Sequence, residues 1–129
     1  MAVEFGTVGF YQAMAETLNE DPVWAQKGGH LHYNMVYRYG PPLDRDFWMT
    51  FKEGKVLNVH ESSAAEAETA DFIISGDTDV WRSIFVGELN PTVAMARGKV
   101  KIQGKASELV KNMGAFKYVL DAMGKVDFA

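Results

Sequence analysis

The chain has 129 residues, of which 47% are hydrophobic and 23% charged, values close to globular averages that exclude wholesale disorder, a collagen-like fibre and a coiled-coil rod. The absence of cysteine excludes disulfides, zinc ribbons, iron–sulfur clusters and thiol catalysis. The net charge of −4 argues against nucleic acid as a partner, because nucleic-acid-binding domains usually carry a basic surface.

The charge is distributed unevenly along the chain. Residues 1–96 carry six basic and 14 acidic side chains, whereas residues 97–129 carry seven basic and three acidic ones. A basic C-terminal third is compatible with transient contact with a phosphate head group or an anionic membrane. Ordinary variation of surface charge is the alternative interpretation.

The apolar residues are unusually rich in aromatic rings and methionine. Phe, Trp, Tyr and Met total 23, against 11 for Leu and Ile. Flat rings and flexible thioethers can line an adaptable apolar pocket, or they can simply fill a core. No apolar run approaches the about 20 residues that span a bilayer, and the N-terminus lacks the pattern of a secretory signal. We therefore expect a cytoplasmic protein.

The first half of the chain predicts one helix followed by three strands. Apolar residues recur at helical spacing over residues 7–20, and Asp21-Pro22 ends this helix, with a further turn at 23–25. Alternating apolar and polar residues then predict strands at 30–39, 46–52 and 56–60. Because the connections are short, we expect an antiparallel meander.

The second half of the chain mixes helices and strands. The predicted elements are a loop or short exposed helix at 61–70, a strand at 71–75, a helix from Gly76-Asp77 to Gly87, a short helix from Asn90-Pro91 to Arg97, a strand at 99–103 and a long helix at 105–124. Gly114 lies inside the last helix, where a close packing contact or a bend would explain it. We expect residues 1–129 to form a single α+β domain.

Residues capable of chemistry do not converge in the sequence. His30 and His32 share a predicted strand face and His60 lies on a nearby strand, but no acidic ligand is placed to complete a metal site. His60-Glu61 suggests a base with its carboxylate, but adjacent strand residues point to opposite faces. Nucleophile-elbow, phosphate-loop and dinucleotide motifs are absent. The sequence favours a binding module without cofactor or metal over a small enzyme.

An ordered set of motifs occupies the second half of the chain. Ala-Asp-Phe-Ile-Ile-Ser-Gly stands at 70–76, a helix from Trp81 ends at Gly87, and Asn90-Pro91 leads to Met-Ala-Arg-Gly-Lys-Val-Lys-Ile-Gln-Gly at 95–104. With the following amphipathic helix, this segment resembles the sterol carrier protein type 2 family.

Two features depart from the pattern of that family. Lys105 stands where members often place Asn or Asp as the cap of the last helix. The peroxisomal tripeptide of eukaryotic carriers is missing from the C-terminal end, so we do not expect a peroxisomal location.

The resemblance implies an α+β fold in which helices cover a mostly antiparallel five-stranded sheet, with an apolar tunnel between sheet and helices. It also implies non-catalytic binding and transfer of a hydrophobic ligand: fatty acid, fatty acyl-CoA, phospholipid or sterol. From their apolar character, we expect the tunnel wall to include Ile74, Trp81, Ile84, Phe85, Met95, Ile102, Met113, Phe116 and Leu120, each of which could instead be plain core. The pocket should measure several hundred Å³ and lie between the sheet and the last helix.

Two further questions stay open at this stage. The chain could instead be an accessory domain that supports an enzyme by dimerisation or by presenting a hydrophobic substrate, and its oligomeric state is not encoded in any motif. Lys99 and Lys101 should leave the last strand on the face opposite Val100 and Ile102. With Lys105 they could meet an anionic surface, or they could simply protect a strand edge.

Overall fold

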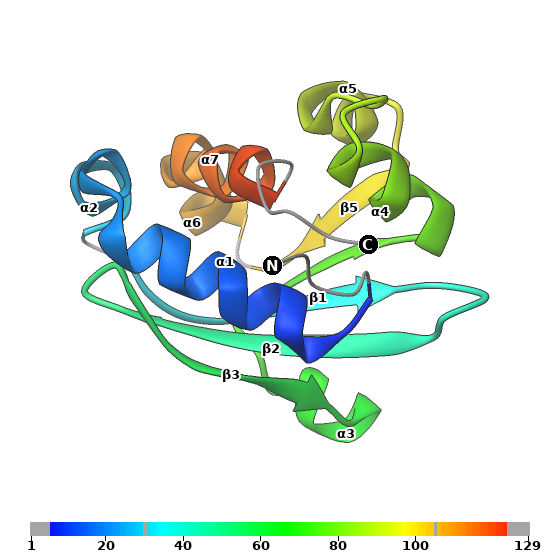
Figure 1. The fold of residues 1–129 in the computed structure, drawn as a ribbon, viewed down its shortest axis with the longest axis horizontal. Helices are drawn as coiled ribbons and strands as arrows, with labels where there is room; N and C mark the ends of the chain where they lie inside the picture. Colours follow the sequence, from blue (N-terminus) through cyan, green and yellow to red (C-terminus); the bar gives the residue numbers. More distant parts are fainter. Residues whose placement is uncertain (1–5, 30, 105, 124–129) are drawn as a thin grey trace.

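The fold is described from a computed structural model (Figure 1). It describes residues 6–29, 31–104 and 106–123, except for the side chains of Pro91, Thr92, Ala106, Leu109, Val110, Met113, Phe116, Leu120, Asp121 and Met123. Lys105, His30 and both chain ends therefore lie outside the described residues.

A five-stranded sheet forms the centre of the molecule, in the order β3-β2-β1-β4-β5. Its strands are β1 (His32–Tyr39), β2 (Arg45–Lys52), β3 (Lys55–Ser62), β4 (Phe72–Gly76) and β5 (Val100–Gln103). The antiparallel meander of β1, β2 and β3 is confirmed. β4 returns to pair with β1 in parallel, and β5 pairs with β4 antiparallel. The mostly antiparallel sheet implied by the resemblance is thus confirmed.

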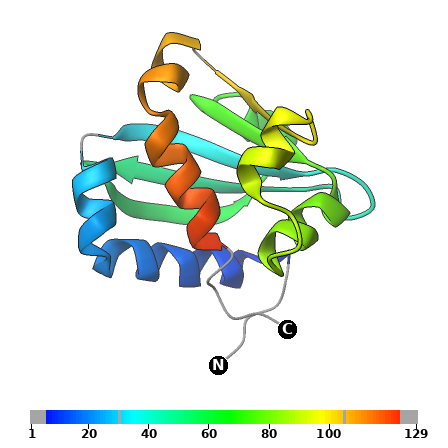
Figure 2. The same ribbon diagram turned by 90° about the horizontal axis from the view of Figure 1, so that it is seen from above.

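Most helices lie on one face of this sheet (Figures 1 and 2). They are α1 (Val8–Glu20), α2 (Pro22–Gly28), α4 (Thr78–Phe85), α5 (Pro91–Ala96), α6 (Ala106–Lys111) and α7 (Met113–Met123). Figure 2 shows α7 crossing the sheet between α2 on one side and α4 with α5 on the other. The short helix α3 (Ala64–Ala67) lies on the opposite face. None of the helices in the described ranges has the length and hydropathy needed to cross a bilayer.

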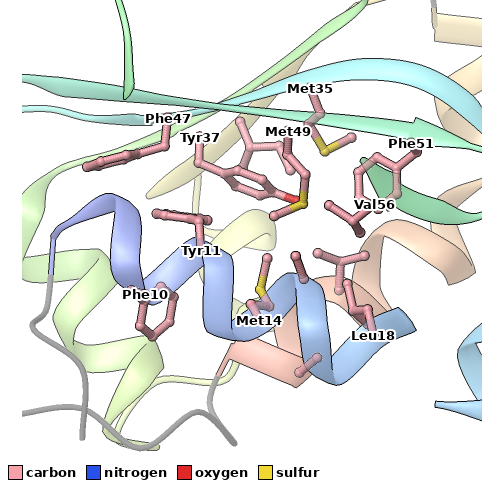
Figure 3. Close-up of a cluster of buried hydrophobic side chains, with 14 of the residues drawn as sticks. Phe10, Tyr11, Met14, Leu18, Met35, Tyr37, Phe47, Met49, Phe51 and Val56 are labelled. Carbon is pink, nitrogen blue, oxygen red and sulfur yellow. The ribbon is translucent and has the colours of Figure 1, made fainter. Parts of the chain in front are cut away.

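The main core fills the space between the sheet and the helical layer (Figure 3). The predicted alternation on β2 is confirmed, because Phe47, Met49 and Phe51 are all buried. From α1, the Tyr11 ring stacks on Tyr37 at 5.2 Å and on Phe47 at 4.9 Å between ring centroids. Each fully buried side chain of this size contributes about 1.5–3 kcal/mol, so these contacts fix α1 against the meander.

A smaller apolar cluster holds α3 against the other face of the sheet. It contains Val36, Trp48, Ala67 and Ile73. The sequence predicted a loop or an exposed helix here, and the helix is confirmed, but Ala67 is fully buried. Among the helices that the structure describes, α3 is the one that covers the far face.

The segment after Asp21 forms a full helix where the sequence predicted only a turn. Asp21 Oδ1 accepts hydrogen bonds from the backbone of Val23 at 2.9 Å and Trp24 at 3.3 Å, and Pro22 occupies the first helical position. Asp21 therefore ends α1 and also caps α2. The Trp24 indole then donates to the Gly54 carbonyl at 2.7 Å, which fixes α2 against the β2–β3 turn.

The prediction of one continuous helix over 105–124 is wrong, because α6 and α7 separate at Asn112. The Asn112 side chain is buried and donates to the Glu108 carbonyl at 3.0 Å, so it competes with the regular helical bonding. A Cβ built on Gly114 would meet no described atom within 4 Å, which contradicts the close-packing explanation for that glycine.

Candidate functional site

The predicted wall residues that the structure describes come together in one buried cluster. Ile74, Trp81, Ile84 and Phe85 are at most 3% exposed, and the partly buried Met95 and Ile102 pack against them. Met113, Phe116 and Leu120 lie on α7, but their side chains are outside the described residues. The cluster joins β4, α4, α5 and β5, and its role as a ligand wall stays a prediction.

Helix α4 positions most of this cluster. Trp81 stacks on Tyr39 with 5.4 Å between ring centroids, and its indole donates to the Arg38 carbonyl at 3.0 Å. The helix ends at Phe85, and Gly87 follows it as the predicted C-terminal glycine: its φ is +82°, and the backbone N–H groups of Gly87 and Glu88 donate to the carbonyls of Ile84 and Ser83. The apolar side of α4 is thereby fixed toward the sheet.

A pocket of about 490 Å³ opens where β1 and β4 meet α6. Its lining combines Tyr33, Ala70, Asp71, Phe72, Gly104 and Glu108. It lies beside the first segment of the predicted last helix, its lining is mixed rather than wholly apolar, and none of the predicted wall residues lines it. A continuous tunnel from this pocket into the core stays a prediction.

Polar contacts hold this pocket in shape. The Tyr33 hydroxyl donates to the Glu108 carboxylate and accepts from Asn112 Nδ2 at 3.4 Å. The hydrogen bond to Glu108 is the largest cause of the raised pKa of Tyr33. A Cβ on Gly104 would lie 2.2 Å from the Phe72 ring, so only glycine leaves that ring in place. The pocket therefore offers both an aromatic wall and hydrogen-bonding groups.

Three tyrosines form a polar group inside the core that the sequence analysis did not identify. The hydroxyls of Tyr11 and Tyr39 are 2.6 Å apart and fully buried. The hydroxyl of Tyr37 is also buried and has no hydrogen-bond partner among the described residues. Burial is the main cause of the raised pKa of all three phenols. The tyrosines that recur at alternate positions of β1 are the sequence feature that could have indicated this group.

The candidate base His60 pairs with a carboxylate that the sequence did not suggest. Its Nε2 lies 3.0 Å from Glu66 Oε1 of α3, and its ring stacks on Trp48 at 5.8 Å. The hydrogen bond to His60 lowers the pKa of Glu66. Within the described ranges, which omit His30, no three His, Asp or Glu side chains are grouped so that they could hold a metal ion.

Residues 39–117, more than half of the chain, match the family model described as the SCP-2 sterol transfer family. The chain belongs to this family. The resemblance stated from the sequence is thus confirmed, and the family model covers the wall residues from Ile74 to Phe116. Among curated proteins, no match was found.

Solved structures share the fold at low sequence identity. A crystal structure of sterol carrier protein 2 aligns over 95% of this chain and 99% of its own, with a TM-score of 0.81 and 21% identity. Sterol Carrier Protein-2 from Aedes aegypti, in complex with palmitate, aligns over 85% and 92%, with a TM-score of 0.54 and 20% identity. A double mutant of a sec-alkyl sulfatase aligns over 82% of this chain but only 15% of its own, with a TM-score of 0.60 and 19% identity.

Proposed function

We propose that the protein binds a hydrophobic ligand between the sheet and the helices of its main core and transfers it between donors and acceptors without chemical change. The observation that carries this proposal is membership of the SCP-2 sterol transfer family. The similarly folded Aedes aegypti protein was solved with palmitate, which supports a fatty acid as one ligand class. Fatty acyl-CoA, phospholipid and sterol are the other classes proposed.

The interior is chemically suited to such a ligand. Aromatic and methionine side chains dominate the main core, and each methylene of an acyl chain gains about 0.8 kcal/mol when it is buried. Methionine adapts its shape readily, so Met95 and Met113 would tolerate ligands of different outline. The pocket beside Tyr33 and Glu108 would receive the polar end of the ligand. Specificity would then be loose, because few directional bonds are involved.

A substitution on α7 tests the proposed wall. We expect Met113→Gln to weaken the binding of a fluorescent fatty acid by about tenfold or more, because an amide buried without a partner costs about 1–3 kcal/mol. Affinity is measured by fluorescence titration after thermal unfolding has shown that the variant is folded. The matched control is Lys117→Gln, an exposed position on the same helix. Equal affinities for the two variants would remove Met113 from the wall.

An accessory role beside an enzyme is the second candidate. The alignment to a small part of a sec-alkyl sulfatase shows this fold inside a much longer catalytic chain. In this alternative the protein would present a hydrophobic substrate or hold a dimer together. Native mass measurement separates the two: a monomer with bound lipid supports the carrier, whereas an empty obligate dimer or a stable enzyme partner supports the accessory role.

Two further proposals concern where the protein acts. We place it in the cytoplasm, in line with the sequence. We also propose brief contact with an anionic membrane during ligand delivery, for which the basic C-terminal third is the supporting observation.

A further inference from the structure

A row of polar side chains crosses the far face of the sheet, on the side opposite the main core. Strand register places Lys101 beside Ser75, Ser75 beside Arg38, and Arg38 beside Asp46. Directly paired residues point to the same face of a sheet, and Lys99, which directly precedes β5, lines the same pocket as Lys101. Val100 between them is buried on the core side, as the sequence predicted.

The positive charges of this row are not equivalent. The Arg38 guanidinium is held by Asp46 through Nε at 2.9 Å and Nη2 at 3.3 Å, and by Glu68 at 3.3 Å. Its position is therefore fixed and its charge is compensated. Lys99 and Lys101 are exposed and have no carboxylate oxygen within 4.0 Å among the described residues. The two ammonium groups therefore supply the excess charge, in a protein whose net charge is −4.

These side chains surround a pocket of about 570 Å³ at the end of strands β1 and β4. The lining consists of Arg38, Gly40, Ser75, Gly76, Asp77, Val80, Gly98, Lys99 and Lys101. A Cβ on Gly40 would lie 2.6 Å from Asp77 Oδ1, so a larger residue there would displace this carboxylate. Gly98 has a φ of +72°, which other residues rarely adopt. The pocket stays open because these positions carry no side chain.

We propose that this pocket is a binding site for a phosphate-bearing group. Two ammonium groups, the serine hydroxyl and the edge of a fixed guanidinium are the donors that phosphate oxygens accept best. Because Asp46 and Glu68 compensate Arg38, the two lysines against the single acidic Asp77 leave the lining net positive. The volume lies within the range of about 300–1,000 Å³ that small-molecule sites occupy.

The site is separate from the proposed lipid site. Its lining shares no residue with the proposed ligand wall or with the pocket beside Tyr33, although Val80, its one branched apolar side chain, also packs against the main core. The end groups that reach this pocket are those of Arg38, Lys99 and Lys101, so we expect the occupant to be recognised by its charge. The inference therefore holds or fails independently of lipid binding in the interior.

Calorimetric titration with inorganic pyrophosphate at low ionic strength tests the site. The parent protein should bind the probe, and the double variant Lys99→Ser, Lys101→Ser should bind it at least about tenfold more weakly, because the loss of two charge-assisted donors removes most of the recognition. Both lysines are exposed, so the variant should keep the thermal midpoint of the parent. Lys99→Ser alone should show an intermediate loss.

The matched control removes the same charge elsewhere. Lys52 and Lys55 are exposed and paired at the β2–β3 turn, and Lys52→Ser, Lys55→Ser should bind pyrophosphate within about twofold of the parent. An equal loss in both double variants would show that overall charge attracts the anion and would overturn the site. Absence of measurable binding to the parent at low salt would also overturn it.

Binding to lipid vesicles distinguishes a lipid headgroup from a soluble phosphate compound as the occupant of the pocket. The parent is sedimented with phosphatidylcholine vesicles that contain or lack phosphatidate. Binding only to the phosphatidate vesicles, displaced by pyrophosphate and lost in Lys99→Ser, Lys101→Ser, would support a lipid headgroup as occupant. Pyrophosphate binding without vesicle binding would support a soluble phosphate compound.

Discussion

Replacing Trp81 by alanine is expected to lower the free energy of unfolding of the lipid-free protein by about 3–5 kcal/mol. Trp81 is fully buried, stacks on Tyr39 at 5.4 Å and donates its indole hydrogen bond to the Arg38 carbonyl. The substitution removes both the packing and the hydrogen bond and leaves a cavity between α4 and β1. Urea denaturation followed by circular dichroism measures the loss.

The same experiment separates plain core from ligand wall. Trp81→Phe keeps an aromatic ring but loses the hydrogen bond, so it should lower the free energy of unfolding by less than Trp81→Ala does. The difference between the two losses measures the packing that the alanine variant removes. A loss below about 2 kcal/mol for Trp81→Ala, together with lost fatty-acid binding, would show that the indole borders an open ligand space. That outcome would contradict the tight packing of Trp81 but support the proposed wall.

Stability is expected to fall steeply as the pH rises above about 10, the ordinary pKa of tyrosine. Burial raises the pKa of Tyr11, Tyr37 and Tyr39 in the folded protein. Above pH 10 the unfolded chain releases these protons while the folded chain keeps them, so the stabilisation present below that pH is lost as the pH rises. Each phenol contributes up to about 1.4 kcal/mol per pH unit. Urea denaturation between about pH 8 and pH 11 measures the slope.

Two tyrosine variants test which phenols cause this dependence of stability on pH. Tyr37→Phe should reduce the slope by up to about 1.4 kcal/mol per pH unit, and it should cost little stability at neutral pH, because the Tyr37 hydroxyl has no partner among the described residues. Tyr11→Phe should reduce the slope similarly but cost about 0.5–1.5 kcal/mol at neutral pH, because it removes the 2.6 Å hydrogen bond between the two buried hydroxyls. A pH profile that stays flat to pH 11 would contradict the burial of these phenols.

The sheet could be predicted from the sequence because alternation of side chains encodes it directly. Phe47, Met49 and Phe51 are buried as the pattern required, and Lys99 and Lys101 are exposed on the face opposite Val100. The resemblance supplied the mostly antiparallel five-stranded sheet, but the return of β4 to β1 was not predicted. Local patterns do not specify the order of strands, because pairing depends on contacts between distant segments.

The missed features depend on contacts that no local pattern reveals. Asn112 ends α6 through bonds to Glu108 and to Tyr33, the latter 79 residues away in the chain. Asp21 was interpreted only as a helix end, since a residue before proline usually is one, and its second role as a cap needs the structure.

For the candidate site, the sequence identified apolar residues that do come together. Ile74 and Trp81 share the main core because β4 and α4 follow each other closely along the chain. The pocket beside Tyr33 and Glu108 was not predicted, because its lining combines β1, β4 and α6 and includes none of the predicted wall residues. The far-face pocket could not be predicted, since Arg38 and Lys101 meet only through the register of β4 between them.

The most direct test of the carrier function is mass spectrometry of lipid extracted from the purified protein, before and after incubation with palmitate and with a sterol. We predict a hydrophobic molecule that is stoichiometric with the chain in at least one of these samples, and that is retained through gel filtration. A chain that emerges empty from all of them, while folded by circular dichroism, would contradict the proposal that its interior carries lipid.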